Sequence, residues 1–347
     1  MLNHFNIEVT APFVRWPVVA DRRGCAGAPR CGYDEDVPAR LADLDAQGVD
    51  TQVVFSSLFL NIRCVRANAE LALTRAYNRW IAQRCADSHG RLRWIFVPSL
   101  KNPQETVRDM DWAVRNGAVG VLFRGIEGDR FLDHPYFDPI YQKALELDWP
   151  ICVHIGHGSP AMESIAQRDG ARFNRFISDC PNYFAFATLL NSELPKKFPL
   201  LRFGFFESGC SWVSGVVQTA LHVRLAPRAL MALVREKLEE HHFYVTCELH
   251  EDLPHLLQYT GEGRLMLGSD YGHPGDIADT ILFRQTPPTD VSDRSRKKAR
   301  ARTTIARVRD LHSRVAVPLH VAALRLRRQR HRSDPCRTTS NQGSVRA

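Results

Sequence analysis

The sequence predicts an α/β fold, a (β/α)8 TIM barrel, from three observations. Short apolar runs of strand length alternate with segments of helical spacing between residues 37 and 267. Such runs are typical of a parallel sheet that helices cover on both faces. A chain of 347 residues with 44% hydrophobic content has room for one barrel of about 250 residues with extensions. An open doubly wound sheet is the alternative, but no strand is followed by a G-x-G-x-x-G turn.

Seven runs are predicted as strands because each is short and apolar and is bounded by a turn or a helical segment. They are Thr51–Phe55, Leu92–Val97, Val119–Phe123, Trp149–Ile155, Leu201–Phe206, Phe243–Cys247 and Leu265–Leu267. An eighth strand would have to be Phe5–Thr10, near the start of the chain. The expected barrel therefore has an incomplete or divergent first strand.

Helices are predicted between these strands from apolar residues at helical spacing and from the stop signals that follow. Gly48 ends the first helix, His89-Gly90 the second and Asn116-Gly117 the third. The predicted helices are Val37–Gly48, Asn68–Ala86, Glu105–Arg115, Pro139–Leu147 and Arg228–Glu240, and Ser159–Pro199 is a longer insertion.

The net charge of +8 comes from the C-terminal segment, residues 294–347. This segment carries 16 Lys and Arg against 2 Asp and Glu, whereas residues 1–293 carry 30 against 36. It contains no Phe, Trp or Tyr with which to anchor a core. We expect a barrel over residues 1–293 and a disordered basic tail over residues 294–347. A nucleic-acid-binding arm is the alternative, but no aromatic residue alternates with the arginines.

The remaining sequence features favour a cytoplasmic protein. No run of 18 or more apolar residues is present, and no signal-peptide pattern follows Met1. The nine cysteines are scattered, and Cys152 and Cys247 lie inside apolar strands, which indicates buried thiols rather than a disulfide framework. We therefore expect no membrane partner and no specific nucleic-acid partner.

Ionisable residues follow several of the predicted strands. His154, Glu207 and Asp270 each end a strand, and His4 lies just before the candidate first strand. Because parallel strands bring their carboxyl ends to one face of a barrel, these side chains are expected to converge. Imidazole and carboxylate groups together would form a mixed nitrogen and oxygen site for a divalent metal.

A purely structural role could also explain each of these strand-end residues. His154 alone could be a hydrogen-bonded strand-end residue, and Asp270 could cap the following turn. Glu207 could form a surface ion pair with Arg202 or Arg124. His157 and His273 are expected to support the metal ligands or to contact substrate.

Six segments resemble the amidohydrolase-related family, in the branch of aminocarboxymuconate semialdehyde decarboxylase and resorcylate-type decarboxylases. They are VPARLADLDAQG, GAVGVLFRGIEG, LDHPYFDPIYQKALELDWPICVHIG, FPLLRFGFFESGCSWV, FYVTCELHEDLP and GEGRLMLGSDYGHP. The resemblance runs from about residue 37 to residue 274, and the ICVH strand combined with GSDYGHP carries most of its specificity.

The resemblance implies a (β/α)8 barrel that holds one divalent metal ion, with zinc expected and manganese as the alternative. His154 matches the fifth-strand ligand, and Asp270 matches the eighth-strand aspartate that acts as ligand and as acid or base. The implied activity is non-oxidative decarboxylation of an aromatic or dienoic carboxylate, with Arg124 anchoring an anionic group of the substrate. A surface ion pair with Glu127 is the alternative role for Arg124. A homodimer is also expected.

The chain departs from the family pattern in three places. Asn3-His4-Phe5 retains one histidine of the usual first-strand pair, while Leu2 stands at the partner position. Glu207-Ser208-Gly209 stands where many members carry a sixth-strand histidine. The closing helix of the family is missing after Arg296-Lys297-Lys298. A late start and a shifted reading frame would explain the two ends, and divergent termini are the other explanation. Beside the decarboxylase, a metal-dependent hydrolase and a non-catalytic homologue therefore stay open.

Overall fold

The computed structural model describes residues 37–46, 49–61, 64–169, 174–248 and 251–267. Within these ranges, seven parallel strands form one sheet in the order β1-β2-β3-β6-β7-β8-β9, and each strand pairs with the next strand of the sheet along the chain. Each predicted run contains or overlaps one of them. The strands are β1 Gln52–Val54, β2 Leu92–Phe96, β3 Ala118–Arg124, β6 Ile151–His154, β7 Phe203–Phe206, β8 Phe243–Cys247 and β9 Leu265–Leu267.

The strand order decides between the two predicted architectures. A doubly wound sheet reverses its strand order at a switch point, whereas a barrel adds each new strand on the same side. No reversal occurs among the described strands. The chain therefore has the predicted (β/α)-barrel type of fold, and Phe5–Thr10, the predicted first strand, lies outside the described residues.

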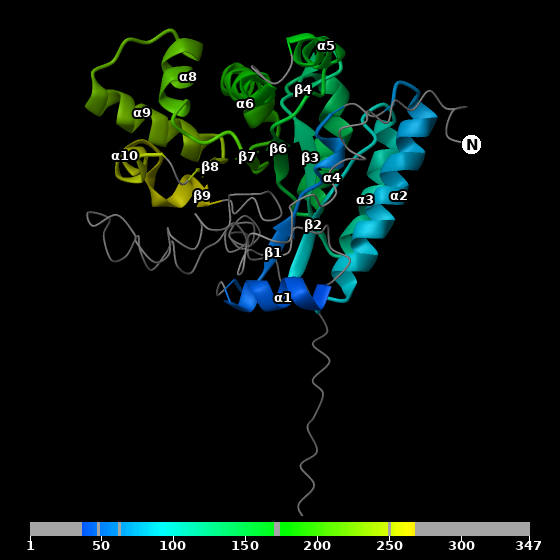
Figure 1. Cartoon of the computed structure of the whole chain (residues 1–347). Helices are drawn as coiled ribbons and strands as arrows, with labels where there is room; N and C mark the ends of the chain where they lie inside the picture. The colour runs from blue at the N-terminus through cyan, green and yellow to red at the C-terminus, as the bar shows by residue number, and fades with distance from the viewer. Residues whose placement is uncertain (1–36, 47–48, 62–63, 170–173, 249–250, 268–347) are drawn as a thin grey trace, which may run out of the picture. The chain divides into compact units, whose positions relative to one another are not determined.

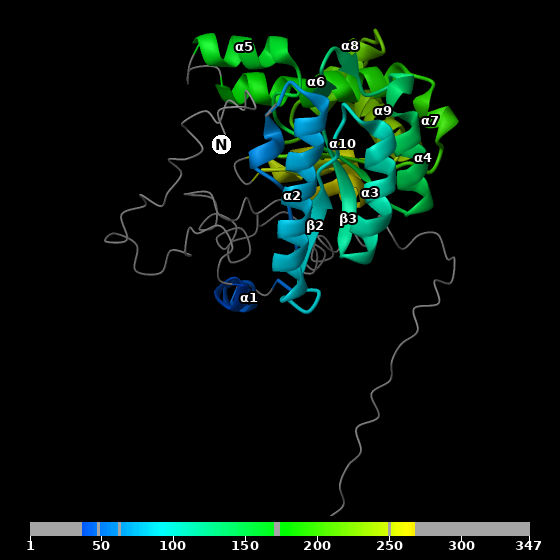
Figure 2. The same cartoon turned by 90° about the vertical axis from the view of Figure 1, so that its right-hand side faces the viewer.

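Helices follow the strands and cover the outside of the sheet (Figures 1 and 2). Five of them confirm predicted segments: α1 Val37–Ala46, α2 Ala67–Ala86, α3 Pro103–Arg115, α4 Asp138–Glu146 and α9 Pro227–Glu240. The predicted insertion contains three more, α5 Pro160–Asp169, α6 Asn174–Asn191 and α7 Leu194–Lys197. Helices α8 Val213–Ala220 and α10 Leu253–Arg264 were not predicted. Short 3-10 turns, η2 Leu58–Leu60 and η3 Pro135–Phe137, and a hairpin of β4 Ile126–Glu127 and β5 Arg130–Phe131 complete the described elements.

Side chains on the strands alternate between two apolar clusters, as the period of two in a strand requires. Phe123 of β3 and Val153 of β6 point outwards into a large cluster shared with the helices. Leu122 and Cys152, the residues before them, belong instead to a smaller cluster inside the curled sheet. This smaller cluster fills the barrel interior, and the residues at the carboxyl ends of the strands lie above it.

Helix α6 packs closely against the strand ends because Gly125, the residue after β3, has no side chain. A Cβ atom at Gly125 would lie only 1.8 Å from the carbonyl oxygen of Pro181 in α6. Figures 1 and 2 show α5 and α6 lying across the end of the sheet at which β6 finishes. The insertion therefore borders the face where a barrel enzyme places its chemistry.

The cysteine prediction is confirmed where the structure describes it. Cys152 and Cys247 are buried thiols in β6 and β8. Burial raises the pKa of the Cys152 thiol, which keeps it protonated at neutral pH. No described helix has the length and apolar character needed to cross a membrane. The predicted tail, residues 294–347, lies outside the described residues.

Candidate functional site

The structure brings two predicted metal ligands together. His154 is the last residue of β6, and Glu207 directly follows β7. These strands are neighbours, with His154 paired in register to Phe206. As a result, the Nε2 atom of His154 lies 3.0 Å from the Oε2 atom of Glu207. The alternative partner proposed for Glu207, Arg202, instead contacts the Asp148 carboxylate at 2.5 Å.

The contacts of His154 suit metal binding. Its Nδ1 atom lies 3.1 Å from the carbonyl oxygen of Ile155, which can accept a hydrogen bond only if Nδ1 carries the proton. In a neutral imidazole the lone pair is then on Nε2 and faces the Glu207 carboxylate. Two acceptors at that distance require a cation between them, either a second proton or a metal ion. A backbone carbonyl that fixes the other ring nitrogen is typical of metal-binding histidines.

The distance between the two atoms also fits a divalent ion. Tetrahedral zinc ligands at about 2.1 Å lie about 3.4 Å apart, so Nε2 and Oε2, now 3.0 Å apart, would separate by a few tenths of an ångström around the ion. His154 is 6% exposed, and its side chain is therefore largely shielded from bulk water. One imidazole and one carboxylate are donor types that divalent metal ions accept.

Glu207 is held in an unusual backbone conformation. Its φ angle is 63°, in the left-handed region that a residue with a side chain adopts rarely. The backbone N–H of Glu207 donates to Thr246 Oγ1 at 3.0 Å, and the Thr246 hydroxyl donates to the Phe205 carbonyl at 3.2 Å. Because Thr246 is buried in β8, this strand fixes the residue that aims the carboxylate at His154.

Helix α6 holds the same loop from the other side. The Asn182 side-chain amide donates to the Phe206 carbonyl and to the Ser208 hydroxyl, each at 3.0 Å. Asn182 is fully buried. The residues on either side of Glu207 are therefore anchored by the insertion, which explains how a segment far from the ligands in sequence contributes to the site.

An aromatic side chain covers the imidazole. The ring centroid of Phe55, just after β1, lies 5.1 Å from that of His154 and 4.6 Å from that of Phe206. Phe55 thus places an apolar surface next to the polar pair. This arrangement reduces the access of water to one side of His154 and strengthens electrostatic interactions there.

Arg124 forms an ion pair with Glu127, one of the two roles proposed for it. Its Nη2 atom lies 2.6 Å from Glu127 Oε2, and its Nε atom donates to both carboxylate oxygens at 3.1 Å. The pair is not on the surface, since the two side chains are only 12% and 4% exposed. Burial alone would lower the pKa of the guanidinium, but the charge and hydrogen bonds of Glu127 outweigh it and the pKa is raised.

His157 lies in the loop after β6 with contacts on both ring nitrogens. Nδ1 lies 3.3 Å from the Glu163 carboxylate, and Nε2 lies 3.0 Å from the Ser178 hydroxyl. The residue is 4% exposed. These contacts connect α5 and α6 to the end of β6. A contact between His157 and the substrate stays a prediction.

Three predicted site residues, His4, Asp270 and His273, lie outside the described residues. Among the residues that are described, no group of three or more His, Cys, Asp or Glu side chains converges on one point. The predicted roles of His4, Asp270 and His273 stay predictions.

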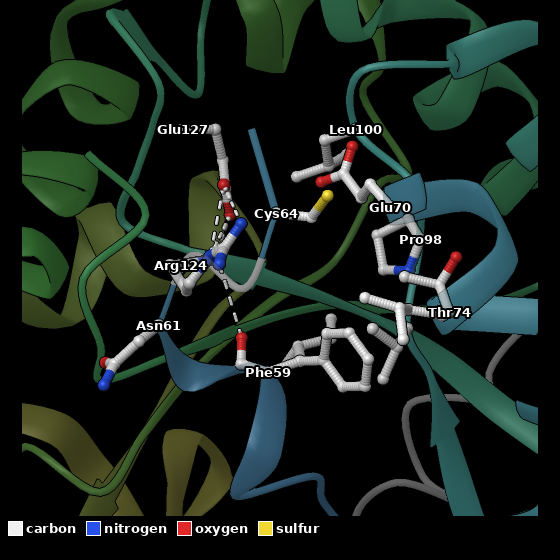
Figure 3. Close-up of a pocket in the computed structure, with 12 residues that line it drawn as sticks. Phe59, Asn61, Cys64, Glu70, Thr74, Pro98, Leu100, Arg124 and Glu127 are labelled. Carbon is white, nitrogen blue, oxygen red and sulfur yellow. Dashed lines mark hydrogen bonds and ion pairs between the residues drawn. The ribbon is translucent and has the colours of Figure 1, made fainter. Parts of the chain in front are cut away.

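A pocket lies beside these residues, at the carboxyl ends of β2 and β3, and Figure 3 shows its lining. Glu70 in α2 contributes a carboxylate that sequence reasoning missed, because it lies on a helix and belongs to no strand-end pattern. Thr246 and Asn182 were also missed. Their spacing carries no signal, although the position of Thr246 one residue before the end of β8 could have suggested a role at the strand ends.

Comparisons with known proteins agree with the fold. A solved amidohydrolase from Mycobacterium avium subsp. paratuberculosis K-10 shares 19% identity with the chain at a TM-score of 0.63, covering 79% of this chain and 73% of that one. A 2,6-dihydroxybenzoate decarboxylase from Rhizobium shares 20% identity at a TM-score of 0.60, covering 79% and 88%. A dihydroxybenzoic acid decarboxylase from Polaromonas sp. JS666, solved with manganese and 2-nitroresorcinol, shares 18% identity at a TM-score of 0.60, covering 79% and 85%.

Sequence comparison identifies the family. No curated protein sequence matches the chain. The family model described as amidohydrolase matches residues 36–299, which is well over half of the chain. The match includes both His154 and Glu207, and it extends over every described strand. The chain therefore belongs to the amidohydrolase family.

Proposed function

We propose that the protein is a metal-dependent, non-oxidative decarboxylase of an aromatic carboxylate. The observation that carries the proposal is the approach of His154 Nε2 to Glu207 Oε2 at 3.0 Å, at the carboxyl ends of neighbouring barrel strands. Membership of the amidohydrolase family supports it, as does the likeness of the fold to decarboxylases that act on dihydroxybenzoates. One of these was solved with manganese, which supports a divalent metal in the site.

His154 and Glu207 would hold the metal ion, together with His4 and Asp270 as predicted from the sequence. Zinc and manganese both suit such a set of nitrogen and oxygen donors. When bound, the ion supplies positive charge that stabilises the negative charge developing as the carboxylate departs.

The other residues would bind, orient and protonate the substrate. The Asp270 carboxyl would deliver the proton that replaces carbon dioxide on the ring carbon. Arg124, His157 and His273 would line the substrate site, and Phe55 would keep water from one side of His154. Thr246 and Asn182 would hold Glu207 in place from β8 and α6.

Carbon dioxide release tests the proposal. Protein loaded with manganese or zinc is incubated with 2,6-dihydroxybenzoate and related hydroxybenzoates, and carbon dioxide and the matching phenol are quantified. We expect both products in equal amounts, and their loss in the Glu207→Gln variant but not in the exposed control Glu236→Gln. Hydrolysis of esters or amides without carbon dioxide release would indicate the hydrolase alternative. A fully loaded protein with neither activity would indicate the non-catalytic homologue. The homodimer and the cytoplasmic location stay predictions.

A further inference from the structure

The pocket of Figure 3 adjoins the proposed metal pair and has its own chemistry. It lies between α2, η2 and the ends of β2 and β3, is open to solvent, and has interior room for little more than a water-sized group. Arg124 in its wall is the register partner of His154 on the neighbouring strand. Adjacent strands lie about 4.8 Å apart, so a substituent on a ring bound next to His154 would reach towards this pocket.

The only guanidinium among the pocket-lining residues is already bound by the protein. Nε and Nη2 of Arg124 contact Glu127, and Nη1 points to the Phe59 carbonyl at 3.4 Å. The Glu127 carboxylate also accepts the backbone N–H of Arg124 at 2.7 Å, which fixes the pair in place. Each guanidinium nitrogen thus faces an acceptor of this chain. Arg124 offers no uncompensated charge to a second anion.

A second carboxylate makes the pocket unfavourable for anions. Glu70 lines it and is 13% exposed, and its oxygens accept from Ser99 Oγ at 3.3 Å and from the backbone N–H of Lys101 at 3.1 Å. The Lys101 ammonium lies 3.6 Å away and is 36% exposed, so solvent weakens its compensation of the Glu70 charge. The pocket lining therefore carries two carboxylates against one guanidinium.

Apart from Asn61 and Thr74, the rest of the lining is apolar and includes Phe59, Leu73, Val97 and Leu122. Such a surface can contact the edge of an aromatic ring, while the carboxylate oxygens accept hydrogen bonds from a ring substituent. A hydroxyl group can donate to these oxygens. A carboxylate can only repel them.

We propose that this pocket receives an uncharged, hydrogen-bond-donating substituent such as a ring hydroxyl, and that the preferred substrate carries a single carboxylate. The inference rests on the proposed function and specifies its substrate class. Glu127 and Glu70 would act as specificity-determining residues, because they remove the anchor for a second anion and supply acceptors for a hydroxyl. The predicted role of Arg124 changes accordingly, from binding an anion to positioning Glu127.

Matched ligands test the inference directly. In each pair, a carboxylate replaces one hydroxyl of a dihydroxybenzoate: 2,4-dihydroxybenzoate against 2-hydroxyterephthalate, and 2,6-dihydroxybenzoate against 3-hydroxyphthalate. Calorimetric titration of the metal-loaded, full-length protein gives the dissociation constants. We expect the monocarboxylate of at least one pair to bind 10-fold tighter or more.

Charge variants connect that preference to the pocket. Glu70→Gln keeps the size of the side chain and removes one negative charge, so the preference should shrink at least 3-fold. The exposed control Glu236→Gln should leave it unchanged. Lys101→Gln leaves the Glu70 charge unopposed and should widen the preference, which provides a second test if Glu70→Gln does not fold.

The outcomes separate this inference from the proposed function. A binding preference for the monocarboxylates without carbon dioxide release would support the pocket assignment and contradict the decarboxylase. Carbon dioxide release with equal or tighter binding of the dicarboxylates would support the decarboxylase and overturn the inference. Binding of no member of either pair, or a preference that neither charge variant changes, would also overturn it.

Discussion

Replacing Glu127 by alanine should destabilise the fold by about 3 to 5 kcal/mol, because it leaves the Arg124 guanidinium buried without its counter-charge. This loss of stability is large because the Arg124 and Glu127 side chains are buried, at 12% and 4% exposed. The substitution also removes the acceptor of three hydrogen-bond donors of Arg124, which are Nε, Nη2 and the backbone N–H. For a domain of this size, each kcal/mol shifts the melting temperature by about 2 to 4 °C, so the expected drop is roughly 6 to 20 °C.

Two controls make this prediction specific to burial. Glu193 and Lys196 also form an ion pair with a spacing of three residues, but their side chains are 80% and 77% exposed. Glu193→Ala should therefore change stability by less than about 1 kcal/mol. The double variant Arg124→Met with Glu127→Leu should recover most of the lost stability, because it removes both charges and keeps the volume.

Thermal and urea unfolding, followed by circular dichroism, measure these differences. A Glu127→Ala variant no less stable than Glu193→Ala would refute the role of the buried charge. A double variant as unstable as Glu127→Ala alone would refute it too, since the cost would then come from packing rather than from an unpaired charge.

Two further variants test the supports of the site. Thr246→Val removes the hydroxyl that accepts the Glu207 N–H at 3.0 Å, so metal affinity measured by calorimetry should fall about 10-fold or more. Thr246→Ser keeps the hydroxyl and should restore the affinity. Equal affinities in the wild type and both variants would contradict the role of Thr246. Gly125→Ala would place a Cβ atom 1.8 Å from the Pro181 carbonyl and should destabilise the fold by about 2 kcal/mol or more in thermal unfolding. Gly215→Ala, with open space around it in α8, should be neutral or stabilising, and similar melting temperatures for both variants would show that α6 does not pack as described.

The strands could be predicted because burial on both faces leaves a direct mark on the sequence. Runs such as ICV before His154 in β6 and FGFF in β7 are short and continuously apolar, and both are buried. The missed helices lack the corresponding signal. Helix α6 contains Pro181, and α10 contains Gly261 at a φ of 66°. Tertiary packing holds α6 in a helix despite Pro181, whereas α10 is kinked at Gly261, where the backbone is not helical.

The candidate site was predictable where it depends on topology alone. Parallel neighbouring strands must bring His154 and Glu207 to one edge, and the sequence showed both at strand ends. Side-chain pairing depends on three-dimensional burial, which spacing does not reveal. The Arg124 and Glu127 pair, one of two roles considered for Arg124, was placed at the surface although it is buried. Glu70, on α2, was not expected in the pocket at all.

Metal content tests the central claim, that His154 and Glu207 hold a divalent ion. Purified protein is saturated with zinc or manganese, freed of unbound metal by gel filtration and measured by elemental analysis. We expect about one equivalent in the wild type and in the exposed control His255→Ala, and less than about one tenth of that in His154→Ala and Glu207→Gln. Equal metal content in all four proteins, or none in the wild type, would contradict the claim.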